Sequence, residues 1–268
     1  MIIKAKKSLG QNFLVDKNII EKISCSLKID SQLNLIEIGP GHGSLTNALI
    51  KKKPAQILVI EKDSNMTEIL NKKFNNKIKI INDDILKVPI QKYIKPKTII
   101  FGNLPYNIST KILTNFIKFI NKENLIKYFV FMFQKEVADR IIAKENSKNY
   151  GRLSVLVDWK LHVKKVFDIN PECFRPKPKV KSSLLIFEPK KKYFELEKVK
   201  TLEHITNIFF HRRRKIIKNP MKILFKNYLD VSEELNLDLN LRPQNLDTDT
   251  YLKICYYYEK NYLNNLST

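Results

Sequence analysis

Short apolar runs that end in glycine or polar residues, each followed by a helix-like stretch, limit the fold of this chain most strongly. Four of them occupy residues 33–38, 57–60, 78–81 and 99–102. Runs of roughly four to eight apolar residues bounded by turn signals are typical of fully buried strands. Strands that alternate with helices pair in parallel, with right-handed crossovers between them. The sequence therefore predicts an α/β fold with a doubly wound, mostly parallel sheet.

The strand signals stop near Tyr193, which divides the chain into two predicted domains. Three further strand-like runs precede this point, at 128–134, 163–167 and 182–187. Residues 1–192 are expected to form the sheet domain, and residues 193–268 a small α-helical C-terminal domain, because only helix-like patterns follow. Within the second domain, an apolar and basic stretch over 208–221 predicts one helix.

The charge balance points to a polyanionic partner. Lysine and arginine number 49 against 27 aspartate and glutamate residues, which gives a formal net charge of +22. Such an excess favours nucleic acid through phosphate contacts and counterion release. Coding bias toward lysine, asparagine and isoleucine is an alternative source of part of this charge. A local basic run favours phosphate binding, and it consists of Arg212, Arg213, Arg214 and Lys215.

Composition also argues against several kinds of site and location. The three cysteines and four histidines are scattered, so no zinc-like spacing exists and no metal site is expected. Separated cysteines of odd number suggest reduced thiols and a cytoplasmic protein. No apolar run approaches the roughly 20 residues that span a bilayer. No apolar segment of the secretory type follows the basic N-terminus.

A glycine-rich loop directly follows the first strand-like run. It reads Gly39-Pro40-Gly41-His42-Gly43 and leads into a helix-like stretch over 44–51. Glycines allow positive φ and let the backbone approach a ligand, whose polar end can meet the helix N-terminus. Such a loop alone does not separate a nicotinamide-binding protein from a methyltransferase.

Carboxylates stand at the ends of the next two strands. Glu61 lies 22 positions after Gly39, an interval suited to a carboxylate that binds two ribose hydroxyls. The third run ends in Asn82-Asp83-Asp84. An acid at that strand end can accept a hydrogen bond from an adenine amine.

The fourth strand runs into Gly102-Asn103-Leu104-Pro105-Tyr106. Parallel α/β sheets bind ligands at such strand ends. Asn103 offers an amide donor and a carbonyl acceptor, Tyr106 offers an aromatic face, and Pro105 fixes φ between them. These groups suit a planar amine such as adenine, although an ordinary turn at a strand end can have the same residues.

In these motifs the chain resembles the ribosomal RNA adenine dimethyltransferase family, whose members use S-adenosylmethionine to modify small-subunit ribosomal RNA. The resemblance covers nearly the whole chain, and Gln-Asn-Phe-Leu combined with Asn-Leu-Pro-Tyr is highly specific. The matching segments are 10–14, 37–41, 59–61, 84–88, 102–110, 134–137, 150–155, 174–180 and 213–215. The resemblance implies a Rossmann-like class I methyltransferase domain that dimethylates the N6 amine of adjacent adenosines in 16S-type ribosomal RNA during ribosome biogenesis.

The resemblance also implies a set of cofactor-binding residues. Glu61 would hold the ribose and Asp84 the adenine amine, while Asn103 would lie between the methyl donor and the target base. The N-terminal segment would contact the cofactor, and the glycine loop would approach it closely. The implied set is Asn12, Leu14, Gly39, Gly41, Glu61, Asp84 and Asn103.

Catalysis is expected from Asn103, Leu104 and Tyr106. The Asn103 side-chain oxygen and the Leu104 carbonyl would accept hydrogen bonds from the adenine amine and aim its lone pair at the methyl group. Tyr106 would stack on the flipped-out base, with Phe174 on its other face. The basic run at 212–215 would bind phosphates of the RNA.

The chain departs from the family pattern at three positions. His42 stands in the glycine loop where a small or aliphatic residue is usual, and Arg175 and Lys177 stand where prolines or neutral residues are common. None of these is a motif residue, so we expect them to affect substrate affinity more than the reaction.

Other functions explain parts of the sequence. Another nucleic-acid adenine N6-methyltransferase, or one that acts on protein glutamine, would carry a related Asn-Pro-Pro-Tyr loop, whereas this chain has Leu104 there. A nicotinamide dehydrogenase explains the glycines and Glu61 but not the 103–106 motif or the charge. A non-catalytic ribosome-assembly factor explains the charge but needs no cofactor residues. The expected partner is small-subunit ribosomal RNA within a pre-30S-type subunit, bound by a monomer.

Overall fold

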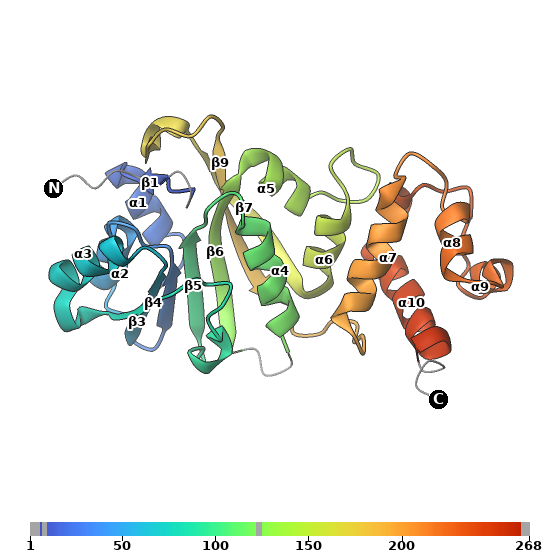
Figure 1. Cartoon of the computed structure of the whole chain (residues 1–268), viewed down its shortest axis with the longest axis horizontal. Helices are drawn as coiled ribbons and strands as arrows, with labels where there is room; N and C mark the ends of the chain where they lie inside the picture. Colours follow the sequence, from blue (N-terminus) through green and yellow to red (C-terminus); the bar gives the residue numbers. More distant parts are fainter. Residues whose placement is uncertain (1–5, 7–9, 122–124, 264–268) are drawn as a thin grey trace. The chain divides into compact units, whose positions relative to one another are not determined.

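The structure, a computed structural model, describes residues 6, 10–121 and 125–263. Its central sheet has the strand order β4-β3-β2-β5-β6-β9-β7 (Figure 1). The strands are β2 (Asn34–Ile38), β3 (Gln56–Glu61), β4 (Lys79–Asn82), β5 (Thr98–Asn103), β6 (Ile126–Gln134), β7 (Leu161–Ile169) and β9 (Ser182–Pro189). The pairs from β4 through β6 are parallel, and β9 is antiparallel to β6. This confirms the predicted doubly wound, mostly parallel sheet.

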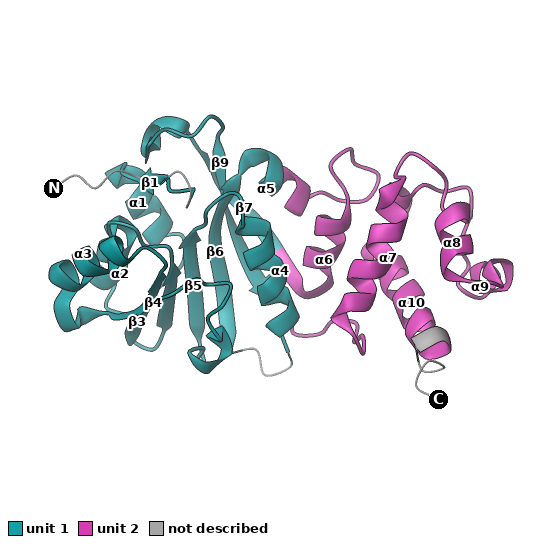
Figure 2. Cartoon of the chain, viewed as in Figure 1, with its two compact units in different colours: residues 1–138, 163–189 teal, residues 139–162, 190–268 magenta. Residues whose placement is uncertain are grey.

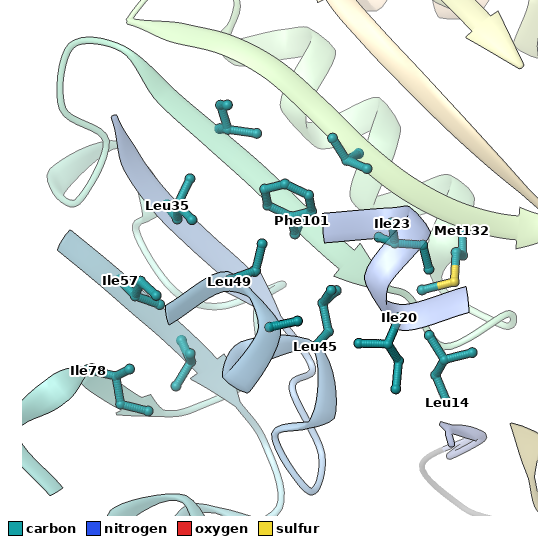
Figure 3. Packing of buried hydrophobic residues seen from close by; sticks show 14 of the residues in the cluster. Leu14, Ile20, Ile23, Leu35, Leu45, Leu49, Ile57, Ile78, Phe101 and Met132 are labelled. Atoms are coloured by element: carbon teal, nitrogen blue, oxygen red, sulfur yellow. The ribbon is translucent and has the colours of Figure 1, made fainter. Parts of the chain in front are cut away.

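One face of the sheet is covered by the first helices of the chain. Ile20 and Leu49 come from two of these helices and lie in one buried cluster with Leu35, Ile57 and Phe101 of three neighbouring strands (Figure 3). Burial of such side chains stabilises the fold by about 1.5–3 kcal/mol each. The helices on this side are α1 (Lys17–Ser24), α2 (Ser44–Lys51) and α3 (Ser64–Phe74).

The opposite face carries an aromatic core under α4 (Ser109–Phe119). Side chains alternate between the two faces along a strand, so Phe129 and Phe131 of β6 point away from Val130. The ring of Phe116 in α4 lies 5.2 Å from that of Phe129 and 6.0 Å from that of Phe131. The short helix α5 (Lys135–Ile141) follows β6 directly.

A separate two-stranded sheet pairs the N-terminal segment with a late hairpin of the chain. β1 (Phe13–Leu14) pairs antiparallel with β8 (Phe174–Arg175), so that Leu14 lies opposite Phe174. Both side chains belong to the buried cluster that also contains Ile20 and Ile23 of α1. The pairing therefore brings the segment before α1 next to a hairpin some 160 positions later.

The chain divides into two compact units (Figure 2). One consists of Met1–Ala138 and Val163–Pro189, and the other of Asp139–His162 and Lys190–Thr268. The later division lies close to the expected boundary near Tyr193, but the second unit also takes in α6 (Arg152–Lys160). Trp159 of α6 donates a hydrogen bond of 2.7 Å to the Phe194 carbonyl, which ties this helix to the segment that begins the C-terminal helices.

The single helix predicted over 208–221 is wrong. The C-terminal helices are α7 (Val199–His211), α8 (Lys218–Leu224), α9 (Tyr228–Glu234) and α10 (Thr248–Tyr258), and turns occupy the residues between α7 and α8. Pro220 gives the physical reason, because inside a continuous helix its ring would clash with the carbonyl four residues earlier, whereas the first turn of a new helix tolerates it. Among all described residues, no helix has both the length and the apolar character needed to cross a membrane.

Candidate cofactor and catalytic site

The glycine loop and the Asn103 loop leave the sheet side by side. β2 and β5 are parallel neighbours, and Ile38 lies opposite Gly102, so both strands end at the same edge. β2 pairs with β3 on its other side, so the strand order reverses between β2 and β5. Open α/β sheets bind ligands at such a switch point.

A pocket of about 150 Å³ opens at this edge. Its walls come from the N-terminal segment, the glycine loop, the ends of two strands and the loop after β5. The site residues predicted from the sequence that line it are Asn12, Gly39, Gly41, Glu61, Asp84, Asn103, Leu104 and Tyr106. The fold thus gathers these residues from five separate segments. In the described ranges, no group of three or more histidine, cysteine or acidic side chains suits a metal ion.

Glu61 ends β3 with its carboxylate almost fully buried. The main-chain N–H of Gly41 donates to Oε2 at 3.1 Å, and that of Asp63 donates to Oε1 at 2.9 Å. Burial raises the pKa of Glu61, while these two N–H groups act in the opposite direction. A carboxylate has about four acceptor positions, so both oxygens keep capacity for hydroxyl groups of a ligand.

Asp84 lies two residues beyond β4 and remains ionised. The main-chain N–H of Leu86 donates to Oδ1 at 3.0 Å, and Lys62 Nζ donates to Oδ2 at 3.0 Å. Partial burial acts to raise the pKa of Asp84, but Leu86 and Lys62 outweigh it and hold that pKa below its ordinary value. An ionised carboxylate at this position accepts hydrogen bonds from an amine.

The N-terminal segment fixes the side-chain amide of Asn103. Its Nδ2 donates to the main-chain carbonyl of Asn12 at 2.7 Å. The donor group is thereby engaged, and nothing in the described part of the chain donates to Asn103 Oδ1 or to the Leu104 carbonyl. The Asn103 side-chain oxygen and the Leu104 carbonyl oxygen therefore remain as acceptors for a ligand.

Gly102 allows the Leu104 side chain to stay buried. A Cβ on Gly102 would lie 2.6 Å from Leu104 Cδ2, so a larger residue there would displace that side chain.

Tyr106 presents a ring whose far end is anchored. Its hydroxyl lies 2.6 Å from Ser182 Oγ. Burial raises the pKa of Tyr106, so the phenol stays neutral well above pH 7. The Pro105 carbonyl accepts the Ile108 N–H at 3.1 Å and closes the turn before α4. The ring thus has a fixed orientation at the pocket wall.

Two predicted contacts are not found in the pocket. Leu14 and Phe174 are 6% and 0% exposed, and both belong to the core. Phe174 has no free face for a base, which contradicts the predicted stacking. The β1–β8 pairing sets the direction of its side chain, so that Phe174 points inward while the next residue, Arg175, is exposed.

The structure adds residues that the sequence reasoning missed. Gln11 and Phe13 line the pocket, and Gln11 Nε2 donates to Asp63 Oδ2 at 3.0 Å. Gln11 and Phe13 stand inside the Gly-Gln-Asn-Phe-Leu motif, which was their available signal. Asp63 is the N-cap of α3 and accepts the Asn65 N–H. An aspartate before a helix predicts a cap but reveals no long-range partner.

The basic run lies in the turns between α7 and α8, within the second unit. Arg212, Arg214 and Lys215 are exposed. Arg213 is half-buried and donates to the Lys148 carbonyl at 2.9 Å. Arg212, Arg214 and Lys215 can therefore reach a phosphate, whereas the hydrogen bond of Arg213 stabilises the turn.

The three departures from the family pattern lie outside the pocket lining. The ring of His42 packs on Phe13 with centroids 4.4 Å apart, and burial together with Lys73 lowers the pKa of His42. Arg175 donates to main-chain carbonyls of its own hairpin, and Lys177 forms an ion pair there.

Comparison with known proteins agrees with this geometry. The ribosomal RNA adenine dimethylase family matches the chain over residues 2–260. A protein named ribosomal RNA small subunit methyltransferase A, from Pelagibacter ubique (strain HTCC1062), is 52% identical over 259 residues, which cover 97% of this chain and 98% of the relative. A protein of the same name from Ehrlichia canis (strain Jake) is 40% identical over 257 residues, with 94% and 96% covered.

Solved structures share the architecture. A dimethyladenosine transferase from Plasmodium falciparum superposes with a TM-score of 0.79 at 28% identity, over 92% of this chain and 98% of that one. The 23S rRNA methyltransferase ErmE has the same fold, with a TM-score of 0.63 at 20% identity over 93% and 100% of the two chains. Because the family match spans nearly the whole sequence and a relative is identical at half of its positions, the chain belongs to the ribosomal RNA adenine dimethylase family.

Proposed function

We propose that this chain transfers methyl groups from S-adenosylmethionine to the N6 amine of adjacent adenosines in small-subunit ribosomal RNA, two to each adenine. The single observation that carries the proposal is the Asn103 amide, whose donor is engaged by Asn12 while its acceptor remains available in a pocket at the switch point. The family membership and the names of the relatives support the same reaction.

The pocket fits the proposed cofactor. Glu61 offers buried carboxylate oxygens to ribose hydroxyls, and Asp84 offers an ionised acceptor to the adenine amine. Gly39 and Gly41 have φ of +65° and +54°, and their lack of side chains lets a ligand approach the main chain. When bound, S-adenosylmethionine supplies an electrophilic methyl group on a sulfonium, which needs no metal activation.

Asn103 and Leu104, at the end of β5, would orient the adenine amine for attack on the methyl group. The N6 amine of adenine is a poor nucleophile because its lone pair is delocalised into the ring. Asn103 Oδ1 and the Leu104 carbonyl accept its two N–H groups, which favours a more tetrahedral nitrogen and directs the lone pair at the methyl group. After attack the nitrogen is cationic, and its proton leaves to water.

The target base must leave its stack to reach these acceptors. Tyr106 offers a ring for stacking, and its bond to Ser182 keeps the ring in place. Enzymes that act on bases stack the extruded base on such side chains. Because Phe174 is buried, Tyr106 is the aromatic contact that we assign to the base.

We assign RNA binding to the helical domain, residues 193–268. Between His211 and Leu229 the sequence has seven lysines and arginines and no acidic residue, and Arg212, Arg214 and Lys215 are exposed. Such a run supplies phosphate contacts without base selectivity. The proposed partner is the RNA within a pre-30S-type subunit, the enzyme acts as a monomer, and its proposed location is the cytoplasm.

The test is methyl transfer from labelled S-adenosylmethionine to small ribosomal subunits that lack these methyl groups. Nucleoside mapping should find N6,N6-dimethyladenosine at adjacent positions, and subunits already methylated serve as the control. If the subunits stay unlabelled and a parallel reaction with DNA in their place labels adenine, a different adenine methyltransferase is favoured. Tight subunit binding without any label would favour an assembly factor without activity.

A further inference from the structure

The N-terminal residues 10–13, here called the strap, form one wall of the pocket and contact both functional loops. The ring of Phe13 lies against Gly41 of the glycine loop, where a Cβ would meet Phe13 Cδ1 at 2.7 Å. Gly10 lies beside the loop after β5, where a Cβ would come within 3.1 Å of Asn107 Oδ1. The strap is therefore packed closely at both ends of the pocket.

Gln11 holds the strap through both ends of its side-chain amide. Its Nε2 donates to Asp63 Oδ2 at 3.0 Å, and its Oε1 accepts the main-chain N–H of Lys6 at 2.7 Å. Lys6 Nζ also donates to Asp63 Oδ1 at 2.7 Å. The Asp63 side chain is fully buried, so loss of a partner there would leave a buried charge less well satisfied.

Asp63 also bonds to Glu61, the carboxylate that we expect to hold the ribose of the cofactor. Its main-chain N–H donates to Glu61 Oε1 at 2.9 Å. Burial acts to raise the pKa of Asp63, but the hydrogen bonds from Lys6, Gln11 and Asn65 outweigh it and keep the group ionised. A charged acceptor makes these hydrogen bonds stronger than neutral ones.

One connected path thus runs from the ribose carboxylate to the residue that meets the adenine amine. It passes from Glu61 to Asp63, then to Gln11, then along the main chain to the carbonyl of Asn12, and ends at Asn103 Nδ2. The last bond decides which way the Asn103 amide is turned, because a carbonyl can accept only from the NH₂ side of that amide.

We propose that Gln11 and Asp63 are positioning residues for methyl transfer. They hold the strap so that the Asn12 carbonyl fixes the Asn103 amide with Oδ1 available to the adenine amine. This inference rests on the proposed role of Asn103 and goes beyond it, since it gives the strap an effect on the rate of the chemical step. A strap that served only as a wall would affect cofactor affinity alone.

The test compares Gln11→Ala and Asp63→Asn with the unaltered enzyme. Asparagine caps helices as well as aspartate does and keeps the N–H that bonds Glu61, so Asp63→Asn mainly weakens the bonds to Lys6 and Gln11. With saturating cofactor and unmethylated subunits, the single-turnover rate should fall about tenfold or more in each variant, the effect of losing one hydrogen bond to a charged group. Asp30→Asn, an exposed aspartate of the same unit that accepts the Gln32 N–H and does not line the pocket, is the control and should keep the full rate.

A second comparison separates this inference from the proposed function. If Gln11 acts through Asn103, Gln11→Ala should cause no further loss of rate in an Asn103→Ala enzyme, because the group that it positions is gone. A full additional loss in the double variant overturns the proposal, as does a normal rate of Gln11→Ala at saturation when only cofactor affinity has fallen. A normal rate of Asn103→Ala alone would instead contradict the proposed function. Unfolding midpoints identify any variant that lost its structure, and Asp63→Asn then replaces Gln11→Ala in the double variant.

Discussion

The aromatic ring of Phe13 occupies the space that a side chain at position 41 would need. A Cβ on Gly41 would meet Phe13 Cδ1 at 2.7 Å, and Gly41 has φ of +54°. The strap and the glycine loop are therefore in close contact, and this contact together with the positive φ favours glycine at position 41.

Replacement of Gly41 should weaken cofactor binding. In Gly41→Ala the new Cβ displaces Phe13, and the left-handed backbone costs about 1–2 kcal/mol. We expect the dissociation constant for S-adenosylhomocysteine, measured by calorimetry, to rise about tenfold. Gly151→Ala is the control, because its backbone is extended and nothing lies within 4 Å of the new Cβ. An equal loss in both variants would contradict the role of the Phe13–Gly41 contact.

Glu61→Ala should weaken cofactor binding by about 1.5–3 kcal/mol, the range for hydrogen bonds to a charged group. The substitution removes the oxygens expected to accept the ribose hydroxyls, and it also removes the partner of the Gly41 and Asp63 N–H groups. Calorimetry measures the effect. Glu68→Ala, an exposed position on α3, is the control. Unchanged affinity in Glu61→Ala would remove the ribose assignment.

Glu37 should make stability depend on pH. It is buried in β2 and accepts a hydrogen bond of 2.7 Å from Thr46 Oγ1, and burial raises the pKa of Glu37 from 4.5 to about 7. Between these pH values the folded state holds the proton more tightly than the unfolded chain. The free energy of unfolding therefore falls as pH rises through this window, by roughly 3 kcal/mol from this group.

The comparison is with Glu37→Gln, which keeps an acceptor for Thr46 but does not titrate. Urea unfolding at several pH values from 4.5 to 7 should give a flatter profile for the variant than for the unaltered protein. Identical profiles would show that the Glu37 carboxyl titrates alike in both states.

The residues at strand ends were predictable because one physical rule places them. Parallel strands end at a shared edge, so Glu61, Asp84 and Asn103 could be expected to meet without knowledge of any tertiary contact. The amphipathic pattern likewise gave α2, whose bounds match the expected range of 44–51.

Long-range pairing accounts for what the sequence did not reveal. The inward direction of Phe174 depends on its pairing with Leu14, which no local pattern encodes. The bond between Gln11 and Asp63 joins residues 52 positions apart, and each residue alone has an ordinary local explanation. Pro220, in contrast, was a local signal against one helix over 208–221.

Reversal of charge in the basic run should weaken binding to small subunits. Combined change of Arg212, Arg214 and Lys215 to glutamate removes exposed groups that can bind phosphates. The affinity should fall, and its dependence on salt should become less steep by about 0.7–0.9 for each phosphate that the variant no longer binds. Cofactor affinity should not change. Arg213 stays in place because it braces the turn through Lys148.

A second triple variant controls for total charge. It carries the same reversals at three exposed lysines of the other unit, Lys28, Lys51 and Lys77. If both variants lose the same affinity and the same salt dependence, the net charge of the chain and not the 212–215 run governs binding.

Asn103→Ala should separate chemistry from binding. The Asn103 oxygen is proposed to act mainly in the transition state, so its loss should lower the single-turnover rate roughly a hundredfold, on the order of 3 kcal/mol. Cofactor and subunit affinities should change far less, because an interaction made only in the transition state does not contribute to them.

Variants of Tyr106 should differ from Asn103→Ala, because Tyr106 is expected to contribute to base binding as well as to the rate. Tyr106→Ala removes the ring and should weaken base binding by about 1–3 kcal/mol as well as slow the reaction. Tyr106→Phe keeps the ring and loses only the bond to Ser182, so most of the affinity should survive. Single-turnover methylation of unmethylated subunits, with separate titrations of cofactor and subunits, measures all three variants. If Asn103→Ala methylates at the unaltered rate, the loop after β5 is only a turn, and the acceptor for the adenine amine must lie elsewhere.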